Sequence, residues 1–411
     1  MSMDLIVMKF GGTSVADAER IHLAARRAIK AKQGGSKVVM VVSAMGKSTD
    51  KLISLAKEIC PDPPRRELDM LMTTGERVSM SLMAMAIHAA GHKAISLTGG
   101  QIGLITDSVH TRARIQKIEA DRIRRELQQN RIVIVAGFQG IDEKGEIFTL
   151  GRGASDTTAV ALAAVLEAGY CEIYTDVDGI YTTDPRLEPK ARKIDQISYD
   201  EMLELASLGA GVMHSRAIEF GKKYNVVIHV RSSFTDTAGT LITHEVKQME
   251  HIVVSGVTVK KDMAQFVIQG LPNQPGVAAD LFANIARHKV IVDDIIQTFD
   301  DSGKANTSFT VDQSDLAECK LVMEEVRREY DLSESEIICN DPVAKVSVVG
   351  VGMRTHTGVA EKMFRSLADA KVNINAITTS EIKISCIIDP EHADQAVRAV
   401  HSAFELDKEK G

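Results

Sequence analysis

Roughly the first 240 residues alternate short runs rich in valine and isoleucine with longer segments of helical period. A strand, a helix and a second strand form the unit that produces this rhythm, because neighbouring parallel strands need a crossover connection. Repetition of the unit predicts a mostly parallel sheet. The predicted strands are residues 5–10, 38–43, 94–97, 132–138, 172–175 and 226–230.

Two long helices and one hairpin complete this part of the chain. One helix is predicted over 17–32, where Gly34 and Gly35 provide a C-terminal stop. A methionine-rich helix is predicted over 66–90 and ends before Gly91. Residues 140–151 break the rhythm, because a lysine-glycine pair stands between two short alternating runs. That pattern predicts a hairpin inserted near the edge of the sheet.

After about residue 245 one order of elements occurs twice, at a spacing of roughly 80 residues. Each copy has a strand, a helix, two strands and a helix, but only the first copy ends in a further strand. A strand at 251–260 precedes the first copy, and counting predicts that it crosses over to complete the second. The predicted domains are therefore residues 1–245, an inserted repeat at 264–341, and a second repeat made of 251–263 plus 342–411.

Composition excludes several classes of protein. The 411 residues include 49 Lys plus Arg and 56 Asp plus Glu, and the resulting charge of −7 gives no support to a nucleic-acid-binding surface. The 5 cysteines are scattered, without a CxxC pair or a nearby histidine at ligand spacing, which argues against disulfides and a zinc site. No signal-peptide core or long apolar run is present, so we expect a cytoplasmic protein without a membrane partner.

The strongest local motif is a glycine turn after the first predicted strand. Lys9 ends that strand, and the turn that follows contains Gly11, Gly12, Thr13 and Ser14. The backbone amides of such a turn suit phosphate oxygens, and Lys9 adds an ammonium group. The spacing matches neither the P-loop nor the Rossmann fingerprint. A plain turn in which Thr13 or Ser14 caps the next helix is the simpler alternative.

Two further motifs follow later predicted strands. In the segment 151–156, Arg152 stands between two glycines and suits bidentate binding of a carboxylate, whereas Ser155 and Asp156 alone would be explained as helix caps. The segment 175–186 carries three aspartates, a tyrosine and an arginine at a strand end, where open α/β sheets bind ligands. It lacks the glutamate of an EF-hand, so we expect any metal to arrive with a nucleotide.

Glu76 lies at the methionine-rich helix, beside Arg77. Considered by itself, it is most simply interpreted as a solvated surface acid, because most surface charges have no special role. The functional alternative is a carboxylate that binds the ammonium group of a ligand.

In combination these motifs resemble those of the aspartate kinases. Segments 9–14 (KFGGTS), 42–46 (VSAMG), 74–76 (TGE), 151–156 (GRGASD) and 175–181 (TDVDGIY) have the order and approximate spacing of that family. Residues 346–358 and 373–381 resemble its paired ACT regulatory domains. The resemblance implies an amino-acid-kinase-like fold, a mostly parallel α/β three-layer sandwich, followed by two α+β ferredoxin-like (βαββαβ) ACT domains.

The resemblance implies transfer of the ATP γ-phosphoryl group to the side-chain carboxylate of L-aspartate, the first step toward lysine, threonine and methionine. Mg²⁺ would come with the nucleotide, and no protein metal site is expected. No general base is needed, because the acceptor carboxylate is already ionised at neutral pH. The implied catalytic residues are Lys9 and Asp156. The implied aspartate-binding residues are Ser43, Thr49, Glu76, Arg152 and Ser155. The implied nucleotide-binding residues are Lys9, Phe10, Gly11, Gly12, Thr13, Ser14, Thr175, Asp176, Tyr181 and Arg186.

The ACT pair implies feedback inhibition by an end-product amino acid, and the sequence leaves open whether this is lysine, threonine, both together or diaminopimelate. The effector-binding residues expected from the resemblance are Asp280, Asp294, Gln297, Asn373, Asn375 and Glu381. ACT domains usually pair side by side, so a homodimer or larger assembly is expected. Some relatives make a separate regulatory subunit from an internal start, and Met249 is the position expected for one here.

Three positions depart from the family pattern. Ala154 stands where a third glycine is usual, and its methyl group is expected to narrow the aspartate pocket. Gly211-Val212 replaces a Lys-Val of some relatives, which bears on nucleotide contacts. Ser215 stands where proline often follows the histidine at His214.

Two alternatives remain in view. One is another amino-acid kinase of the same fold, such as a glutamate or N-acetylglutamate kinase, against which Arg152, Glu76 and the ACT pair argue. The other is an ACT-type amino-acid sensor whose kinase half has decayed, and the intact Lys9, Arg152 and Asp156 argue against it.

Overall fold

The computed structural model describes residues 5–151, 153–208, 212–244, 253–354 and 356–408. Predictions that concern Arg152, Gly211 and Met249 lie outside these residues. The chain forms two compact units. The first unit contains the residues up to Tyr181, Lys193–Ser207 and Gly211–Gln248. The second unit contains Thr182–Arg192, Leu208–Ala210 and the residues from Met249 onward. The predicted boundary near 245 is close to this division, but Thr182–Arg192 groups with the C-terminal part, which a linear division of the sequence does not predict.

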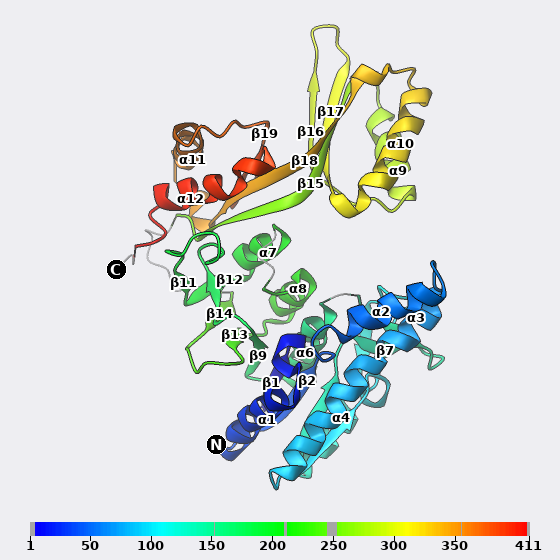
Figure 1. The fold of residues 1–411 in the computed structure, drawn as a ribbon, viewed down its shortest axis with the longest axis vertical. Coiled ribbons are helices and arrows are strands. Elements are labelled where there is room, and N and C mark those ends of the chain that lie inside the picture. The colour runs from blue at the N-terminus through cyan, green and yellow to red at the C-terminus, as the bar shows by residue number, and fades with distance from the viewer. Residues whose placement is uncertain (1–4, 152, 209–211, 245–252, 355, 409–411) are drawn as a thin grey trace. The chain divides into compact units, whose positions relative to one another are not determined.

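The first unit is built on an eight-stranded sheet in the order β12-β14-β13-β9-β1-β2-β6-β3 (Figure 1). Every neighbouring pair is parallel except β13 and β14. The predicted mostly parallel α/β sheet is therefore confirmed. The strands are β1 Leu5–Phe10, β2 Lys37–Val42, β3 Ala94–Leu97, β6 Ile132–Ala136, β9 Tyr170–Thr175, β12 Gln196–Ser198, β13 Ile228–Ser232 and β14 Thr240–Thr243.

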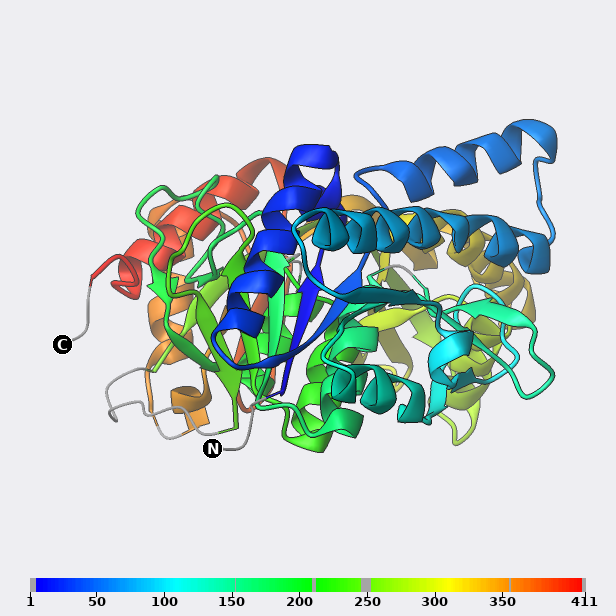
Figure 2. The same ribbon diagram turned by 90° about the horizontal axis from the view of Figure 1, so that it is seen from below.

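Helices cover both faces of this sheet (Figure 2). On one face α1 (Ala18–Gln33) and α4 (Thr74–Ala89) pack on alternate residues of β1, β2 and β6 to form the main apolar core. On the other face α6 (Ala154–Leu166) packs against β1, β2 and β9, and α8 (Ser215–Tyr224) packs on α6. The remaining helices of the unit are α2 Ser48–Ile59, α3 Arg65–Met72, α5 Asp121–Gln128 and α7 Tyr199–Ser207.

Two local predictions need correction. The helix predicted over 66–90 is divided into α3 and α4, because the hydroxyls of Thr73 and Thr74 donate to carbonyl groups of Met70 and Leu71 in the preceding turn, at 3.0 and 2.7 Å. The predicted hairpin forms, as β7 (Gln139–Ile141) with β8 (Ile147–Thr149). It belongs, however, to a separate sheet with β4 and β5 and not to the edge of the main sheet. The bounds of these two strands are β4 Leu104–Thr106 and β5 Ile115–Ile118, and a small pair is formed by β10 Ile180–Tyr181 and β11 Lys193–Ile194.

The second unit contains a six-stranded antiparallel sheet in the order β16-β17-β15-β18-β20-β19. The long strand β15 (Gly256–Leu271) pairs along its first part with the end of β18 (Ile337–Val349), as the crossover hypothesis requires. The same strand then continues into the first repeat, where it pairs with β17. The other elements are α9 Val277–Arg287, β16 Val292–Phe299, β17 Ala305–Asp312, α10 Leu316–Glu329, α11 Val359–Asp369, β19 Ala376–Thr379, β20 Lys383–Ile388 and α12 Ala393–Ala403.

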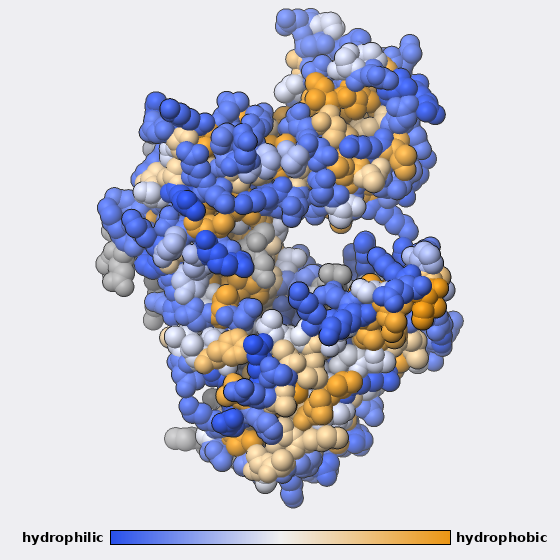
Figure 3. Space-filling view, viewed as in Figure 1, coloured by the Kyte–Doolittle hydropathy of each residue, from blue (hydrophilic) through white to orange (hydrophobic). Residues whose placement is uncertain are grey.

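Each repeat has its own apolar core. One is formed around α9 and α10 and the other around α11 and α12. In the first unit, exposed apolar side chains gather over α3 and α4, including Met70, Val78 and Met85 (Figure 3). No described helix combines the length and the apolar character that a membrane span requires.

Candidate active site

A buried ion pair lies at the carboxyl ends of the central strands. Lys9 is near the end of β1, and its Nζ lies 2.6 Å from Oδ1 of Asp156, in the first turn of α6. The side chains are only 12% and 8% exposed. The other carboxylate oxygen of Asp156 accepts a long hydrogen bond of 3.4 Å from the His214 amide, and burial lowers the pKa of His214. The two residues predicted to be catalytic are thus brought together in a site with little water.

The glycine turn lies beside this pair. The Gly11 amide donates to the Tyr174 carbonyl at 3.2 Å. A side chain at Gly12 would place its Cβ 2.9 Å from the Gly46 carbonyl oxygen and 3.0 Å from that of Ala44, so only glycine fits between these two loops. A Cβ at Gly11 would lie 3.5 Å from Lys9 Nζ, which places the lysine ammonium over the turn.

The turn leads into a short 3₁₀ segment, Gly12–Val15, and not directly into α1. The helix α1 begins at Ala18, and Asp17 caps it by accepting from the Arg20 amide at 2.9 Å. The simpler alternative, in which Thr13 or Ser14 caps that helix, is therefore wrong. Ser14 is instead buried, and its hydroxyl accepts a 2.6 Å hydrogen bond from Ser233.

Glu76 is not a solvated acid. It lies in the first turn of α4 and is 3% exposed, so its interpretation from sequence as a solvated surface acid is wrong. Its Oε1 accepts from the Ala44 amide at 3.1 Å, whereas Oε2 is buried and has no partner among the described residues. Burial raises the pKa of this carboxyl from 4.5 to about 7. A buried carboxylate oxygen without a partner is costly unless a ligand donor satisfies it.

The loop after β2 and the start of α4 meet at this carboxylate. Gly75 permits the approach, because a Cβ there would lie 2.8 Å from Cβ of Ala44 and 3.9 Å from the hydroxyl of Thr49. The Ser43 carbonyl accepts from the Ser79 hydroxyl at 2.7 Å. Ser43, Thr49 and Glu76, three of the residues predicted to bind aspartate, are therefore in one neighbourhood.

The first turn of α6 packs closely on the end of β6. Ser155 is 6% exposed, and a Cβ at Gly137 would lie 2.8 Å from its Cβ and its hydroxyl. Ala154 is fully buried in an apolar cluster with Met72 and Phe148. The extra methyl group of Ala154 thus packs in the protein interior, which does not support the expected narrowing of a pocket.

The predicted nucleotide loop begins at the end of β9. Thr175 and Asp176 share a 3.2 Å hydrogen bond, and the Tyr181 hydroxyl donates to Asp178 at 2.7 Å. Arg186 is 89% exposed, is paired with Asp184 at 2.7 Å, and belongs to the second unit. Its predicted nucleotide contact stays a prediction, as do those of Thr175, Asp176 and Tyr181.

The Phe10 side chain is fully buried and stacks on Tyr174 with ring centroids 4.7 Å apart, so its ring belongs to the core. The nucleotide contact predicted for Phe10 stays a prediction. Sequence reasoning also missed Tyr174 and Ser233, which hold the glycine turn through hydrogen bonds to Gly11 and Ser14. Their position at the ends of β9 and β13, the same sheet edge as Lys9, is the signal that identifies them.

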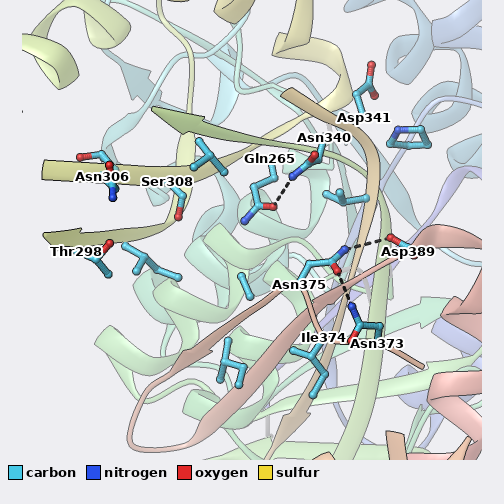
Figure 4. Close-up of a pocket in the computed structure, with 17 residues that line it drawn as sticks. Gln265, Thr298, Asn306, Ser308, Asn340, Asp341, Asn373, Ile374, Asn375 and Asp389 are labelled. Atoms are coloured by element: carbon cyan, nitrogen blue, oxygen red, sulfur yellow. Dashed lines mark hydrogen bonds between the residues drawn. The ribbon is translucent and has the colours of Figure 1, made fainter. Parts of the chain in front are cut away.

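The second unit contains a cavity of about 970 Å³ (Figure 4). Asn373 and Asn375, both predicted to bind an effector, line it together with Gln265 and Asn340. Asn375 donates to Asp389 at 3.1 Å, and Asn340 donates to Gln265 at 3.1 Å. The cavity therefore offers amide donors and carboxylate acceptors close together.

The other predicted effector residues are not among those that line this cavity. Asp294 is buried and accepts from the ammonium of Lys345 at 2.8 Å and from Thr378 at 2.9 Å. The carboxylate predicted to accept an effector ammonium is thus occupied by a lysine of the chain itself. Glu381 pairs with Arg354 at 2.7 Å, while Asp280 and Gln297 are exposed.

Among the described residues no group of three or more His, Cys, Asp or Glu side chains gathers to hold a metal ion. At the sheet edge, Asp156 is a carboxylate beside the glycine turn. One or two carboxylates suffice for Mg²⁺ when nucleotide phosphates and water supply the other ligands. The donor set therefore fits a metal that binds together with a nucleotide.

Comparison with known proteins gives consistent matches. Residues 4–232 match the amino acid kinase family, and residues 346–404 match an ACT domain. An aspartate kinase of Stutzerimonas stutzeri is 49% identical over 410 residues, 100% of this chain and 99% of that protein. An aspartokinase of a Bacillus species is 50% identical over 406 residues, 98% of each chain. The solved structure of aspartokinase III of E. coli in complex with lysine and aspartate has a TM-score of 0.76 at 25% identity, and covers 97% of this chain and 99% of that one.

Proposed function

The chain belongs to the aspartate kinases of the amino acid kinase family, and on this premise we propose how its residues carry out the reaction. The γ-phosphoryl group of ATP would be held between Lys9 and the glycine turn, Gly11 to Ser14. The acceptor is the side-chain carboxylate of L-aspartate. Thr175, Asp176, Tyr181 and Arg186 would hold the nucleotide.

Catalysis in this arrangement consists of positioning and electrostatic stabilisation. Lys9 would neutralise charge on the transferring phosphoryl group, and its ammonium acts strongly because it is shielded from water. Asp156 would orient Lys9 through their 2.6 Å contact and need not remove a proton. Asp156 would also hold Mg²⁺ that arrives with the nucleotide, and the metal would supply further neutralisation of phosphate charge.

The observation that carries the substrate assignment is the unpartnered Oε2 of Glu76. An α-ammonium group would satisfy this buried oxygen and would remove the cost of its burial. Arg152 and Ser155 would bind a carboxylate of the same substrate, and Ser43 and Thr49 would line the pocket. A substrate with both an ammonium group and carboxylates, such as aspartate, fits this set of groups.

A comparison of aspartate with succinate, which lacks the ammonium group, tests this assignment. The wild-type protein should prefer aspartate in kcat/KM by at least about a hundredfold, because a charge-assisted hydrogen bond in a buried site would be lost. Glu76→Gln should lose most of that preference and should affect succinate little. An unchanged preference in Glu76→Gln would exclude Glu76 as the ammonium acceptor.

We also propose that the cavity in the second unit binds the inhibitory amino acid. Its volume of about 970 Å³ is ample for an amino acid, and Asp341 and Asp389 would accept an ammonium group while Asn373 and Asn375 bind a carboxylate. The E. coli relative binds lysine as well as aspartate, which makes lysine the first candidate here and threonine the second. Inhibition requires unequal effector affinity for two states of the protein.

A homodimer through the ACT sheet is the proposed assembly. The strand β16 is an edge strand of the described sheet and exposes Ile295 and Phe299, and such an edge tends to pair with another chain. Light scattering of the purified chain tests this, since a monomer mass would reject it.

A regulatory subunit starting at Met249 would appear as a second, shorter product in an immunoblot of the native source. The cytoplasmic location stays a prediction that cell fractionation can test.

A further inference from the structure

A segment that continues directly from the proposed nucleotide loop is built into the second unit. Residues Thr182–Arg192, which we call the arm, follow Tyr181 and precede Lys193. Those two flanking residues pair with each other in the β10-β11 ribbon of the first unit. The arm itself groups with the ACT repeats. The chain therefore passes from a residue of the nucleotide loop into the regulatory unit within one peptide bond.

The first residue of the arm is held on three sides. The Thr182 carbonyl accepts from the Val257 amide at 2.7 Å, at the start of β15. Its amide donates to the Arg192 carbonyl at 2.9 Å, and its hydroxyl accepts from the Arg192 amide at 3.0 Å. The same hydroxyl lies 2.9 Å from Nε2 of His401, on α12. Because Thr182 and His401 are both 1% exposed, this contact is protected from water.

A second contact joins the arm to α12. Nε of Arg398 donates to the Leu187 carbonyl at 2.9 Å. Beside it lies a cavity of about 440 Å³, lined on the arm by Glu188 and Lys190 and on α12 by Arg398 and His401. The arm is therefore not closely packed along α12, and its position there depends on a small number of polar contacts.

His401 is suited to hold the arm as a neutral group. Burial lowers its pKa, and the nearby Arg192 lowers it further, whereas the carboxylates of Glu188 and Asp407 act in the opposite direction. A neutral imidazole has one donor and one acceptor nitrogen, so Nε2 can serve Thr182 in either role.

We propose that His401 is a positioning residue for the nucleotide site. Through Thr182 it fixes the arm, and through the arm it fixes the chain that continues into Tyr181 and carries Arg186. The ACT repeat that contains α12 would in this way set the affinity for ATP and leave the affinity for aspartate unaltered. This inference rests on the proposed role of Tyr181 and Arg186 in holding the nucleotide.

Steady-state kinetics of His401→Leu in the full chain tests the proposal. The variant replaces the imidazole by an apolar side chain of similar size and therefore loses the hydrogen bond. KM for ATP should rise by about threefold to tenfold, the range expected for one buried hydrogen bond. KM for aspartate and kcat should change by less than about twofold. His401→Gln, whose amide can again donate or accept at this distance, should restore KM for ATP.

Two further variants make the test specific. Thr182→Val should reproduce the rise in KM for ATP, and the double variant should show no additional rise, because both changes remove the same contact. Ser347→Ala is the matched control: the Ser347 hydroxyl is buried in the same unit and shares a 2.7 Å hydrogen bond with the hydroxyl of Ser385, a residue of β20 and not of the arm. It should leave KM for ATP unchanged.

Equal effects on the two KM values, an effect on kcat alone, or failure of His401→Gln to restore KM for ATP would overturn the proposal. So would a normal KM for ATP in both His401→Leu and Thr182→Val. Thermal unfolding followed by circular dichroism identifies a variant that has merely lost its fold, in which case Thr182→Val and His401→Gln decide. Failure of the wild-type chain to phosphorylate aspartate would instead contradict the proposed function, and equilibrium titration with ADP would then still measure the effect of His401 on nucleotide binding.

Discussion

Lys9 and Glu76 are charged groups that folding largely removes from water. Lys9 is compensated by Asp156, whereas one oxygen of Glu76 is left for a ligand. A buried carboxyl with a raised pKa and one unpartnered oxygen, as at Glu76, is typical of functional sites. This difference between the two residues agrees with the separate roles proposed for them, in which Lys9 acts on the phosphoryl group and Glu76 binds the acceptor.

Replacement of Lys9 should remove activity without removing the fold. In Lys9→Ala we expect kcat to fall by at least about a hundredfold, because one preorganised charge at the transferring group is lost. Circular dichroism checks the fold, and Lys9→Met, which keeps more of the packing, serves as a second variant. Lys57→Ala, an exposed lysine on α2, is the control and should be fully active. Retention of more than about a tenth of the wild-type rate, about 1.4 kcal/mol of barrier, would contradict the role of Lys9.

The stability of the protein should reveal the buried charge of Glu76. The pKa of this carboxyl is about 7 in the folded protein and has its ordinary value of 4.5 in the unfolded chain. Between these pH values the folded state therefore holds a proton that the unfolded state releases. Stability should therefore fall as pH rises from about 4.5 to about 7. Glu76→Gln has no carboxyl at this position, so its stability should not fall in this way. Between pH 4 and pH 8 its free energy of unfolding should therefore rise by up to about 3 kcal/mol relative to that of the wild type.

Urea unfolding of both proteins at the two pH values measures this difference. The control is Glu58→Gln, an exposed acid on α2, which should follow the wild type at both pH values. Equal pH dependence in the wild type and Glu76→Gln would show that Glu76 is not buried in its charged form.

The sequence identified Lys9 and Asp156 but not the state of Glu76. Lys9 and Asp156 stand next to glycine turns at predicted strand and helix ends, where ligand sites form. Glu76 follows two threonines and a glycine and precedes an arginine, a polar context that indicates exposure. Its burial arises from the close approach of Gly75 to Ala44, a contact between segments about thirty residues apart that no local pattern encodes.

At the scale of elements, the strands of the parallel sheet were the most predictable part. The strands β1, β2 and β6 are almost continuous apolar runs, and β2 and β6 consist mostly of valine and isoleucine, because both faces of the sheet are covered. The division between α3 and α4 was not predictable from periodicity, since the apolar pattern runs through Thr73. The placement of β7 and β8 in a separate sheet depends on pairing with β4, which is distant in sequence.

The start of α6 provides a test of the departure at position 154. The methyl group of Ala154 is buried in an apolar cluster with Met72 and Phe148. Ala154→Gly should therefore lower the free energy of unfolding by about 1–2 kcal/mol, through helix propensity and a lost buried methyl group. KM for aspartate should remain within twofold of the wild type. A lower KM for aspartate at unchanged stability would show that the methyl group narrows the pocket after all.

At the scale of the whole molecule, the number and order of the elements predicted that the two repeats are joined by a shared strand. The second repeat lacks one strand, and β15 supplies it by pairing with β18 before it enters the first repeat. The assignment of the arm to the second unit was not predictable, because its hydrogen bonds join residues more than seventy and two hundred positions apart, as between Thr182 and Val257 or His401.

The effector cavity predicts separable regulation. In Asn375→Ala, the concentration of lysine or threonine that gives half-inhibition should rise by about tenfold, because a donor to the effector is lost. The uninhibited kcat should not change. Gln313→Ala, an exposed residue of the same unit, is the control. Unaltered inhibition by lysine, threonine and diaminopimelate in Asn375→Ala would place the effector elsewhere.

The central claim is that this chain phosphorylates the side-chain carboxylate of aspartate. Hydroxylamine traps an acyl phosphate as a coloured hydroxamate, so ATP consumption and hydroxamate formation can be measured together with aspartate, with glutamate or with no amino acid. We expect both signals with aspartate and Mg²⁺, and neither with glutamate or without an amino acid. Turnover with glutamate but not aspartate, or no turnover with any of the three, would contradict it.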